Sequence, residues 1–219
     1  MKSSRDKETR FVKLMLDWGE KNKRSFPWRK NRTPYKVLLS EILLQRTPAT
    51  RVALFFPKFV ENYPTLESIA NADMTRLRKF FRPMGLHKRV EWLFSLMREL
   101  RDTYNCKIPD EEEKLVKLPG IGLYTARALL CFGFGKAVSI VDINVARVLS
   151  RVFKGSDAEK RPNDDKTLWS LATKIIPNKF GIQYNESLLD FAIAVCKKDP
   201  LCAKCPITNL CSHNESLSG

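Results

Sequence analysis

The 219-residue sequence predicts an all-α fold, and three observations carry this prediction. Apolar residues recur three and four positions apart, as in Phe11, Leu14, Met15 and Trp18, which would share one helix face. Most prolines fall near the start of such a segment or in a connection, where a helix tolerates them. No run alternates apolar and polar residues, and residues 138–141 are β-prone but too short for more than an extended connector.

The helices are expected to follow one another through short connections, without an internal repeat. A second segment after the first carries apolar residues at 37, 38, 42 and 44. Further helices are predicted over 48–62, 65–70, 73–80, 87–103, 110–117, 122–132, 142–153, 164–176 and 182–196. No linker rich in glycine or serine separates two halves, which favours two helical lobes with a cleft between them. Residues 212–219 are expected to form a loose tail.

The charge of the chain indicates its class of partner. Lysine and arginine outnumber aspartate and glutamate by 39 to 24, which gives a formal net charge of +15 and a pI of about 9.7. This favours a polyanion, with nucleic acid ahead of an anionic membrane. The basic N-terminus is not followed by an apolar run, and no stretch could span a bilayer. We therefore expect a soluble protein of the cytoplasm, or of the nucleus in a eukaryote, that is neither secreted nor membrane-bound.

Four of the six cysteines are crowded near the C-terminus. They follow the pattern Cys196-x5-Cys202-x2-Cys205-x5-Cys211. In a reducing compartment, such short loops indicate metal binding rather than disulfides, with a disulfide pair as the minor alternative. Zinc and a [4Fe–4S] cluster both accept four thiolates, so the spacing leaves the two metals open.

The most informative segment is Leu-Pro-Gly-Ile-Gly-Leu-Tyr-Thr at residues 118–125. A charged run precedes it and an apolar helical segment follows, which indicates a helix–hairpin–helix. Gly120 and Gly122 permit close approach of the backbone, and N–H groups at the start of the second helix can bind a phosphate. Tyr124 lies in the first turn of that helix, and Asp142 begins the next one. An acid near a phosphate-binding hairpin suggests chemistry on DNA.

These features together resemble the helix–hairpin–helix DNA glycosylases of the endonuclease III superfamily. Three further blocks narrow the resemblance to the adenine glycosylases and the related mismatch-specific thymine glycosylases. The blocks are Phe-Pro-Trp-Arg at 26–29, Pro-Tyr-Lys-Val-Leu-Leu-Ser-Glu-Ile-Leu-Leu-Gln-Arg-Thr at 34–47 and Leu-Trp at 168–169. The resemblance covers residues 26–211, nearly the whole chain.

The resemblance implies an organisation in two lobes. Residues 30–135 would form a six-helix lobe that ends in the hairpin, and residues 1–29 with 136–211 a second lobe closed by a [4Fe–4S] cluster. Double-stranded DNA would bind in the cleft, with the target nucleotide flipped out of the stack. The family also favours iron–sulfur over zinc at the four cysteines. The first cysteine interval has five residues here where the family usually has six, a difference that a loop can absorb.

Two acids are candidates for catalysis. Asp142 precedes a helix, so its plain role is an N-cap, and it also matches the family's essential aspartate; the two roles can coexist. A carboxylate there can stabilise the oxocarbenium-like charge that develops on deoxyribose and can orient water. Glu41 lies in an apolar helix, where burial of a carboxyl favours its protonated form, although a solvated glutamate is the ordinary alternative. In adenine-specific relatives the matching glutamate protonates the leaving base; with thymine it would hold the flipped base or a water.

Tyr124 indicates the subfamily. Members with lyase activity carry a lysine at this position, adenine-specific members usually a serine, and mismatch thymine glycosylases a tyrosine. A phenol is not an amine and cannot form a Schiff base, so the resemblance implies monofunctional hydrolysis. The alternative is an aromatic residue that only packs on the hairpin helix.

Further residues are expected to contact DNA. Gln45 and Leu86 match positions from which relatives insert side chains into the base stack, and the plain alternatives are a surface glutamine and a leucine at a helix start. Gly120, Ile121 and Gly122 would supply the backbone contact of the hairpin to phosphate. Cations that would either bind phosphates or simply be solvated are Arg46, Arg51, Lys88, Arg89 and Lys136.

The sequence therefore predicts a monomeric, monofunctional glycosylase that removes thymine and uracil opposite guanine, with an abasic-site endonuclease acting after it. One rival is an adenine glycosylase acting opposite guanine or 8-oxoguanine. Against it, the chain stops soon after Cys211, before the extra domain by which such enzymes usually recognise the oxidised base. A second rival is a non-catalytic DNA-binding iron–sulfur protein, which would need neither Glu41 nor Asp142.

Overall fold

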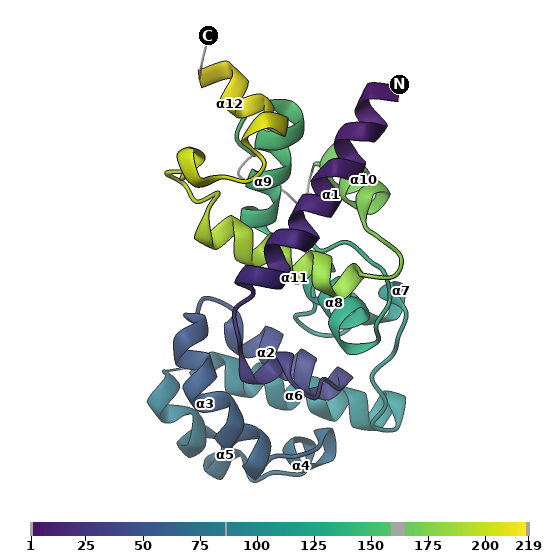
Figure 1. Ribbon diagram of the computed structural model, residues 1–219. Helices are drawn as coiled ribbons and strands as arrows, with labels where there is room; N and C mark the ends of the chain where they lie inside the picture. The colour runs from purple at the N-terminus through teal and green to yellow at the C-terminus, as the bar shows by residue number, and fades with distance from the viewer. Residues whose placement is uncertain (1, 86, 159–164, 218–219) are drawn as a thin grey trace. The chain divides into compact units, whose positions relative to one another are not determined.

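The computed structural model of the chain describes residues 2–85, 87–158 and 165–217. These residues form helices joined by loops, with no strand among them, so the predicted all-α class is confirmed (Figure 1). The chain divides into two compact units. The first unit comprises Met1–Arg24 and Gly135–Gly219, and the second comprises Ser25–Phe134. No helix of the described residues is both long enough and apolar enough to cross a membrane.

The second unit consists of short helices whose starts are fixed by capping residues. Thr33 accepts a hydrogen bond from the N–H of Lys36, and Pro34 takes the first helical position, where its missing N–H costs nothing. Thr65 and Ser68 form a reciprocal capping box. The elements of the second unit are η1 (Pro27–Arg29), α2 (Pro34–Leu44), α3 (Ala49–Asn62), α4 (Leu66–Ala70), α5 (Met74–Phe81), η2 (Arg82–Met84), α6 (His87–Tyr104), α7 (Glu112–Leu115), α8 (Leu123–Ala128) and the π-helical turn η3 (Leu129–Gly133).

Aromatic packing forms much of the core of the second unit. Phe59 of α3 is fully buried, and its ring centroid lies 4.9 Å from that of Phe81 and 5.2 Å from that of Tyr63. These are the offset and edge-to-face distances at which aromatic rings attract each other. Tyr35 of α2 is tied to this group, because its hydroxyl donates a hydrogen bond of 2.6 Å to the carbonyl of Tyr63.

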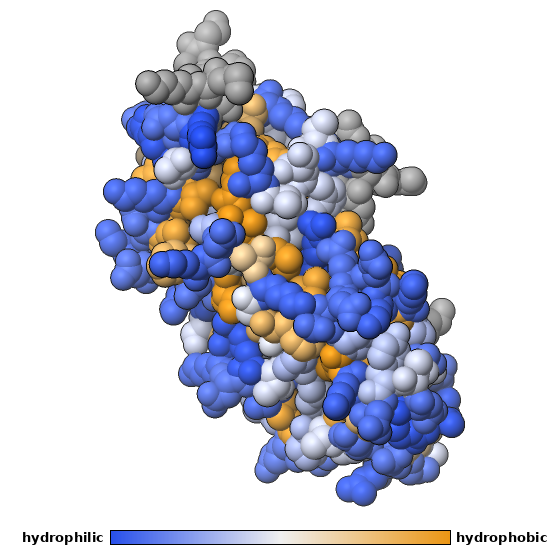
Figure 2. Space-filling model, turned by 90° about the vertical axis from the view of Figure 1, so that its right-hand side faces the viewer, coloured by the Kyte–Doolittle hydropathy of each residue, from blue (hydrophilic) through white to orange (hydrophobic). Residues whose placement is uncertain are grey.

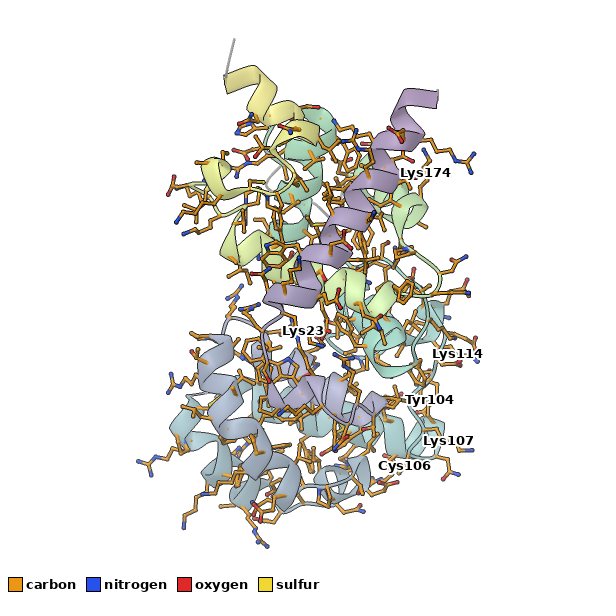
Figure 3. The ribbon with its side chains drawn as sticks, viewed as in Figure 1. Lys23, Tyr104, Cys106, Lys107, Lys114 and Lys174 are labelled. Carbon is orange, nitrogen blue, oxygen red and sulfur yellow. The ribbon has the colours of Figure 1, made fainter. Side chains whose placement is uncertain are left out.

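The first unit is arranged around a close crossing of α1 (Lys2–Asn22) and α11 (Gly181–Ala194), visible in Figure 1. Gly19 makes the crossing possible, since a Cβ built there would lie 1.6 Å from Oγ of Ser187. Lys174, on α10 (Lys166–Ile175) beside α1 in Figure 3, forms an ion pair of 2.7 Å with Glu8. The remaining elements are α9 (Ile143–Lys154), η5 (Cys202–Lys204), η6 (Thr208–Leu210) and α12 (Ser212–Leu217).

Three details differ from the sequence expectation. Residues from Ser212 on were expected to be a tail, but Ser212–Leu217 form α12, which packs against α9. The hydroxyl of Ser212 accepts a hydrogen bond of 2.8 Å from Nζ of Lys7, and this contact across 205 positions could not be read from local sequence. The helix expected over 110–117 is only the single turn α7, and the helix expected over 122–132 changes to π-helical geometry at Leu129.

Polar residues dominate the part of the surface seen in Figure 2. On the face shown in Figure 2, hydrophilic residues cover most of the area, and hydrophobic residues appear in smaller patches between them. Six large apolar side chains are exposed among the described residues: Leu54, Val116, Ile143, Phe180, Ile193 and Leu201. Ile143 directly follows Asp142, so one of these apolar side chains adjoins the candidate acid.

Candidate active site and cysteine loop

Asp142 is the N-cap of α9 and is held by three hydrogen bonds. Its Oδ1 accepts from the backbone N–H groups of Asn144 (2.9 Å) and Val145 (2.7 Å), and its Oδ2 accepts from Nδ2 of Asn144 (2.7 Å). The side chain is half-buried, and its backbone is extended (φ −97°, ψ −177°). The plain capping role is therefore present. The same bonds fix the direction of the carboxylate, which is what a group that stabilises developing charge requires.

A second layer of hydrogen bonds holds Asn144 in turn. Both Nη atoms of Arg147 lie 3.2 Å from Oδ1 of Asn144, one turn along α9. The same guanidinium donates to the carbonyls of Ala192 (2.9 Å) and Cys196 (2.9 Å), at the end of α11 and just beyond it. Asp142 is thus connected through two side chains to the first cysteine of the loop. Sequence reasoning missed Asn144 and Arg147, although their spacing of three residues on the helix after Asp142 is the pattern that would have indicated them.

Glu41 is buried in α2, with 8 % of its surface exposed. Its neighbours in sequence, Leu39, Ile42 and Leu43, are also buried, and α2 packs against α8 and the π-helical turn η3. Gly133 allows the close packing of that turn, since a Cβ there would lie 3.1 Å from the Cα of Pro34. Glu41 is therefore not a solvated surface glutamate.

The predicted hairpin lies between α7 and α8, and Trp92 of α6 supports its turn. Gly120 has a φ of +70°, in the left-handed region that favours glycine, and a Cβ there would lie 2.2 Å from Nε1 of Trp92. Nε1 of Trp92 donates a hydrogen bond of 2.6 Å to the carbonyl of Pro119. An ion pair of 2.7 Å between Arg127 and Glu112 joins the two helices. The turn geometry is thus fixed by a tryptophan that lies 28 residues before Gly120.

The two sides of the hairpin loop differ in what surrounds them. Gly122 is exposed, is the N-cap of α8, and has no atom within 4 Å of the position where a Cβ would lie. Ile121 is buried, and its N–H donates to the carbonyl of Leu118 (3.1 Å), so the residue anchors the turn. Tyr124 is half-buried in the first turn of α8.

The loop after α2 carries Gln45 and Arg46, both exposed. Arg46 has a φ of +51°, uncommon for a residue with a Cβ and typical of positions held by their surroundings. Arg89 holds this loop, because its Nη1 donates to the hydroxyl of Thr47 (2.9 Å) and the carbonyl of Leu43 (3.2 Å). Burial lowers the pKa of Arg89, and the nearby charge of Arg46 lowers it further.

Arg51, Leu86 and Lys88 are three further residues that the sequence predicts to contact DNA. Arg51, expected as a phosphate partner, donates a hydrogen bond of 2.8 Å to the carbonyl of Pro83. Leu86, expected as a second inserted side chain, lies outside the described residues, as does the side chain of Lys88.

The four clustered cysteines line one small, apolar-walled cavity together with Arg151, Val195 and Ile207. None of the four is in a disulfide. Nη1 of Arg151 lies 3.7 Å from Sγ of Cys196, and the same guanidinium donates to the carbonyls of Lys197 and Lys198. Burial raises the pKa of the Cys196 thiol, and the cations Arg151 and Arg147 oppose that shift. Within the described part of the chain, no three Cys, His, Asp or Glu side chains are grouped as a site for a single metal ion.

The candidate residues are distributed over both units. The first unit contains Asp142, Asn144, Arg147 and the four cysteines. The second unit contains Glu41, Gln45, Arg46, Gly120, Ile121, Gly122 and Tyr124. Within the first unit the acid and the cysteine loop are joined by hydrogen bonds, and within the second unit the helices of Glu41 and Tyr124 pack together.

Comparison with known proteins identifies the family to which this sequence and fold are similar. The sequence profile of the HhH-GPD superfamily of base excision DNA repair proteins matches residues 39–174. A thymine/uracil-DNA glycosylase of Methanothermobacter thermautotrophicus is 36 % identical over 210 residues, which are 95 % of each chain. A thymine-DNA glycosylase of Aeropyrum pernix is 32 % identical over 93 % of this chain and 92 % of its own. The solved structure of a thermostable thymine-DNA glycosylase superposes with a TM-score of 0.91, at 33 % identity, over 98 % of this chain and 99 % of that one.

Proposed function

Because the chain belongs to the HhH-GPD superfamily of base excision DNA repair proteins, we propose that it hydrolyses the N-glycosidic bond of thymine and uracil mispaired with guanine in double-stranded DNA. The observation that carries this proposal is that a chain matching thymine-DNA glycosylases along almost its whole length contains both a carboxylate held by hydrogen bonds, Asp142, and a tyrosine at position 124. We propose that each of the two units contributes residues that contact the duplex.

Asp142 is the proposed catalytic carboxylate. When the C1′–N1 bond breaks, its electron pair leaves with the base and positive charge develops on the sugar. A carboxylate fixed by three donors can stabilise that charge without reorganising. Water then bonds to C1′ and gives a proton to a general base of the protein, for which the Asp142 carboxylate is the candidate.

Glu41 and Tyr124 are proposed to act on the flipped nucleotide. Burial of Glu41 suits a group that holds the base or a water molecule rather than one that faces solvent. Tyr124 has no amine, so we expect no covalent intermediate with C1′ and no strand cleavage by the protein. The abasic product would then pass to a separate endonuclease.

The hairpin and the loop at 45–46 are the proposed DNA contacts. The open space beside Gly122 would let a phosphate reach the backbone at the start of α8. Gln45 is exposed on a loop held by Arg89 and is a candidate for insertion into the base stack. Leu86, outside the described residues, is the second candidate that the sequence predicts. Arg46 would bind phosphate beside it.

We also propose that Cys196, Cys202, Cys205 and Cys211 hold a [4Fe–4S] cluster. Four thiols on one cavity fit a cluster that takes four cysteine ligands, and the cations Arg151 and Arg147 partly oppose the burial that raises the pKa of the Cys196 thiol. A bound cluster would stabilise the cysteine loop, whose first cysteine accepts a hydrogen bond from Arg147 at its carbonyl. Brown protein containing iron and inorganic sulfide in equal amounts would support this assignment, and colourless protein loaded with zinc would overturn it.

A duplex cleavage assay tests the proposed function directly. Duplexes carrying G·T, G·U, G·A or 8-oxoguanine·A are incubated with the protein and then split with and without hot alkali. We expect product from G·T and G·U only, and only after alkali, because the protein itself leaves the strand intact. Preferential loss of adenine would assign the rival specificity, strand breaks without alkali would contradict monofunctional hydrolysis, and no excision from any duplex would refute the enzyme.

A further inference from the structure

The segment that leads into Asp142 lies in neither a helix nor a strand. This connector, residues 135–141, joins the end of the π-helical turn to the N-cap of α9. Ser139, Ile140 and Val141 are all buried, with 3 %, 1 % and 0 % of their surface exposed. Buried backbone N–H and C=O groups need hydrogen-bond partners, which the ladder of a helix or sheet does not supply to a connector.

Asn185 of α11 supplies two of these partners. Its Oδ1 accepts a hydrogen bond of 3.2 Å from the N–H of Ile140, and its Nδ2 donates one of 3.0 Å to the carbonyl of Val138. The side chain is 2 % exposed. A carboxamide offers one acceptor and one donor side by side, as a peptide group does, so Asn185 pairs with the connector as a neighbouring strand would.

Two further contacts hold the connector against α10 and α11. The hydroxyls of Ser139 and Thr173 of α10 lie 3.2 Å apart. Gly181, at the start of α11, lies so close to Ala137 that a Cβ would approach its Cα to 3.2 Å. Helices α10 and α11 therefore fix the connector. Among these contacts, the hydrogen bond of Asn185 to Ile140 involves the connector residue nearest in sequence to Asp142.

We propose that Asn185 is a positioning residue for Asp142. By fixing the backbone at Val138 and Ile140, it sets where the chain enters α9 and hence where the carboxylate lies. This inference rests on the proposed function, because it assigns Asn185 a part in the chemistry at Asp142. A displacement of about 1 Å at a reacting group can lower a rate by roughly 100-fold, so small shifts of the connector would matter.

The test compares Asn185→Ala with Ser187→Ala. Ser187 is a matched control because it is buried on the same helix, yet its hydroxyl donates a hydrogen bond within that helix, to the carbonyl of Gln183. In Asn185→Ala we expect the single-turnover excision rate on G·U duplex to fall about 10- to 100-fold, with the affinity for that duplex within about two-fold of wild type. Ser187→Ala should keep the wild-type rate. A rate for Asn185→Ala within two-fold of wild type, or an equal loss in both variants, would overturn the proposal.

A second variant keeps the test valid if Asn185→Ala does not fold. Asn185→Asp has almost the same shape, but as a carboxylate it cannot donate to the carbonyl of Val138. When protonated, the same group regains a donor beside its acceptor. We expect the ratio of its excision rate to that of wild type to rise as the pH falls, and the ratio removes pH effects that both proteins share. A ratio independent of pH would contradict the role of the second hydrogen bond.

Hydrogen exchange separates this inference from the proposed function. The amide of Ile140 should be protected in wild type and exchange faster in Asn185→Ala, whether or not the protein excises any base. Wild type that excises nothing refutes the proposed function, whereas an active wild type with unchanged Ile140 exchange in the variant refutes the role of Asn185 alone.

Discussion

The two units hold their functional groups by different means. In the first unit, hydrogen bonds fix Asp142: two backbone donors and Asn144 bind it, and Arg147 and Asn185 hold what surrounds it. In the second unit, packing accompanies hydrogen bonds: Glu41 is buried in α2, and the hairpin turn both packs against the indole of Trp92 and accepts its hydrogen bond at the carbonyl of Pro119. Hydrogen bonds fix the orientation of a side chain, whereas packing mainly fixes the position of a segment. A carboxylate that stabilises charge at one atom needs a fixed orientation, and a turn that binds a DNA backbone needs mainly a fixed position.

Replacement of Asp142 by asparagine should produce the largest effect. Asn caps helices about as well as Asp, so Asp142→Asn keeps the fold while removing the charge. We expect the single-turnover excision rate on G·U duplex to fall about 10³-fold or more, with duplex affinity retained.

Asp165→Asn is the matched control for that variant. Asp165 is also an aspartate N-cap, of α10, and accepts a hydrogen bond of 2.9 Å from the N–H of Leu168. It should retain wild-type turnover. If Asp142→Asn turned over normally, Asp142 would be a cap alone and the distinction between the two units would lose its functional meaning.

The two hairpin glycines should respond to alanine in opposite ways. Gly120→Ala places a methyl group against Trp92 at a positive φ, and we expect the free energy of unfolding to fall by about 2–4 kcal/mol. Gly122→Ala meets no atom within 4 Å and should change stability by less than about 1 kcal/mol, while weakening duplex binding because the methyl group would keep phosphate away from the backbone.

Urea denaturation and duplex titration of both glycine variants measure these effects. Equal stability losses in the two variants would show that Trp92 does not determine the turn. Unchanged duplex affinity in Gly122→Ala would remove Gly122 from the proposed DNA contact.

Local patterns in the sequence were enough to predict the elements, and long-range contacts explain what they missed. Helical spacing predicted the all-α class, and the Pro-Gly-Ile-Gly run predicted the turn between α7 and α8. Trp92 and Asn185 escaped prediction because each acts on a segment 28 or 45 residues away in sequence, for Gly120 and Ile140 respectively. Arg147 escaped because its partners, at the end of α11 and beyond, are defined only by the fold.

Motifs rather than helical spacing predict the catalytic and cluster residues. Asp142, Glu41, Tyr124 and the four cysteines match motifs of the family, and their roles stay predictions. The structure adds the surroundings of each, such as the burial of Glu41 and the cavity shared by the cysteines. The chemical role of each residue depends on the substrate that it contacts, and the excision assays test these roles.

Two tyrosines, the half-buried Tyr35 of the second unit and the buried Tyr184 of the first, differ in whether the hydroxyl is hydrogen-bonded. The hydroxyl of Tyr35 in the second unit donates to the carbonyl of Tyr63, whereas the buried hydroxyl of Tyr184 in the first has no hydrogen-bond partner among the described residues. Removing a bonded hydroxyl should cost stability, and removing an unbonded one should restore it. We expect Tyr35→Phe to lower the free energy of unfolding by about 1 kcal/mol and Tyr184→Phe to raise it by about 1 kcal/mol. Urea denaturation measures both, and a loss in Tyr184→Phe equal to that in Tyr35→Phe would indicate a bound water at Tyr184.

The smallest predicted effect concerns an ion pair of the first unit and depends on pH. Lys154 lies 2.5 Å from Oδ2 of Asp165, and together with the hydroxyl of Thr167 it holds the pKa of that carboxyl below its usual range. A carboxyl whose pKa is lower in the folded state than in the unfolded chain stabilises the fold above its unfolded pKa of about 3.9, and this contribution is lost as the pH falls. Asp165→Asn should therefore lower the free energy of unfolding by about 0.5–1 kcal/mol near neutral pH, the size of a partly exposed pair.

The difference between wild type and Asp165→Asn should shrink as the pH falls below about 4, because the wild-type carboxylate then becomes protonated and loses its attraction to Lys154. Urea denaturation at a series of pH values measures this difference. Lys154→Met is the matched partner variant, and it should show the same pH dependence if the pair is the cause. A difference that persists unchanged at low pH would assign the loss to the helix cap rather than to charge, and polar contacts in the first unit would then act by geometry alone.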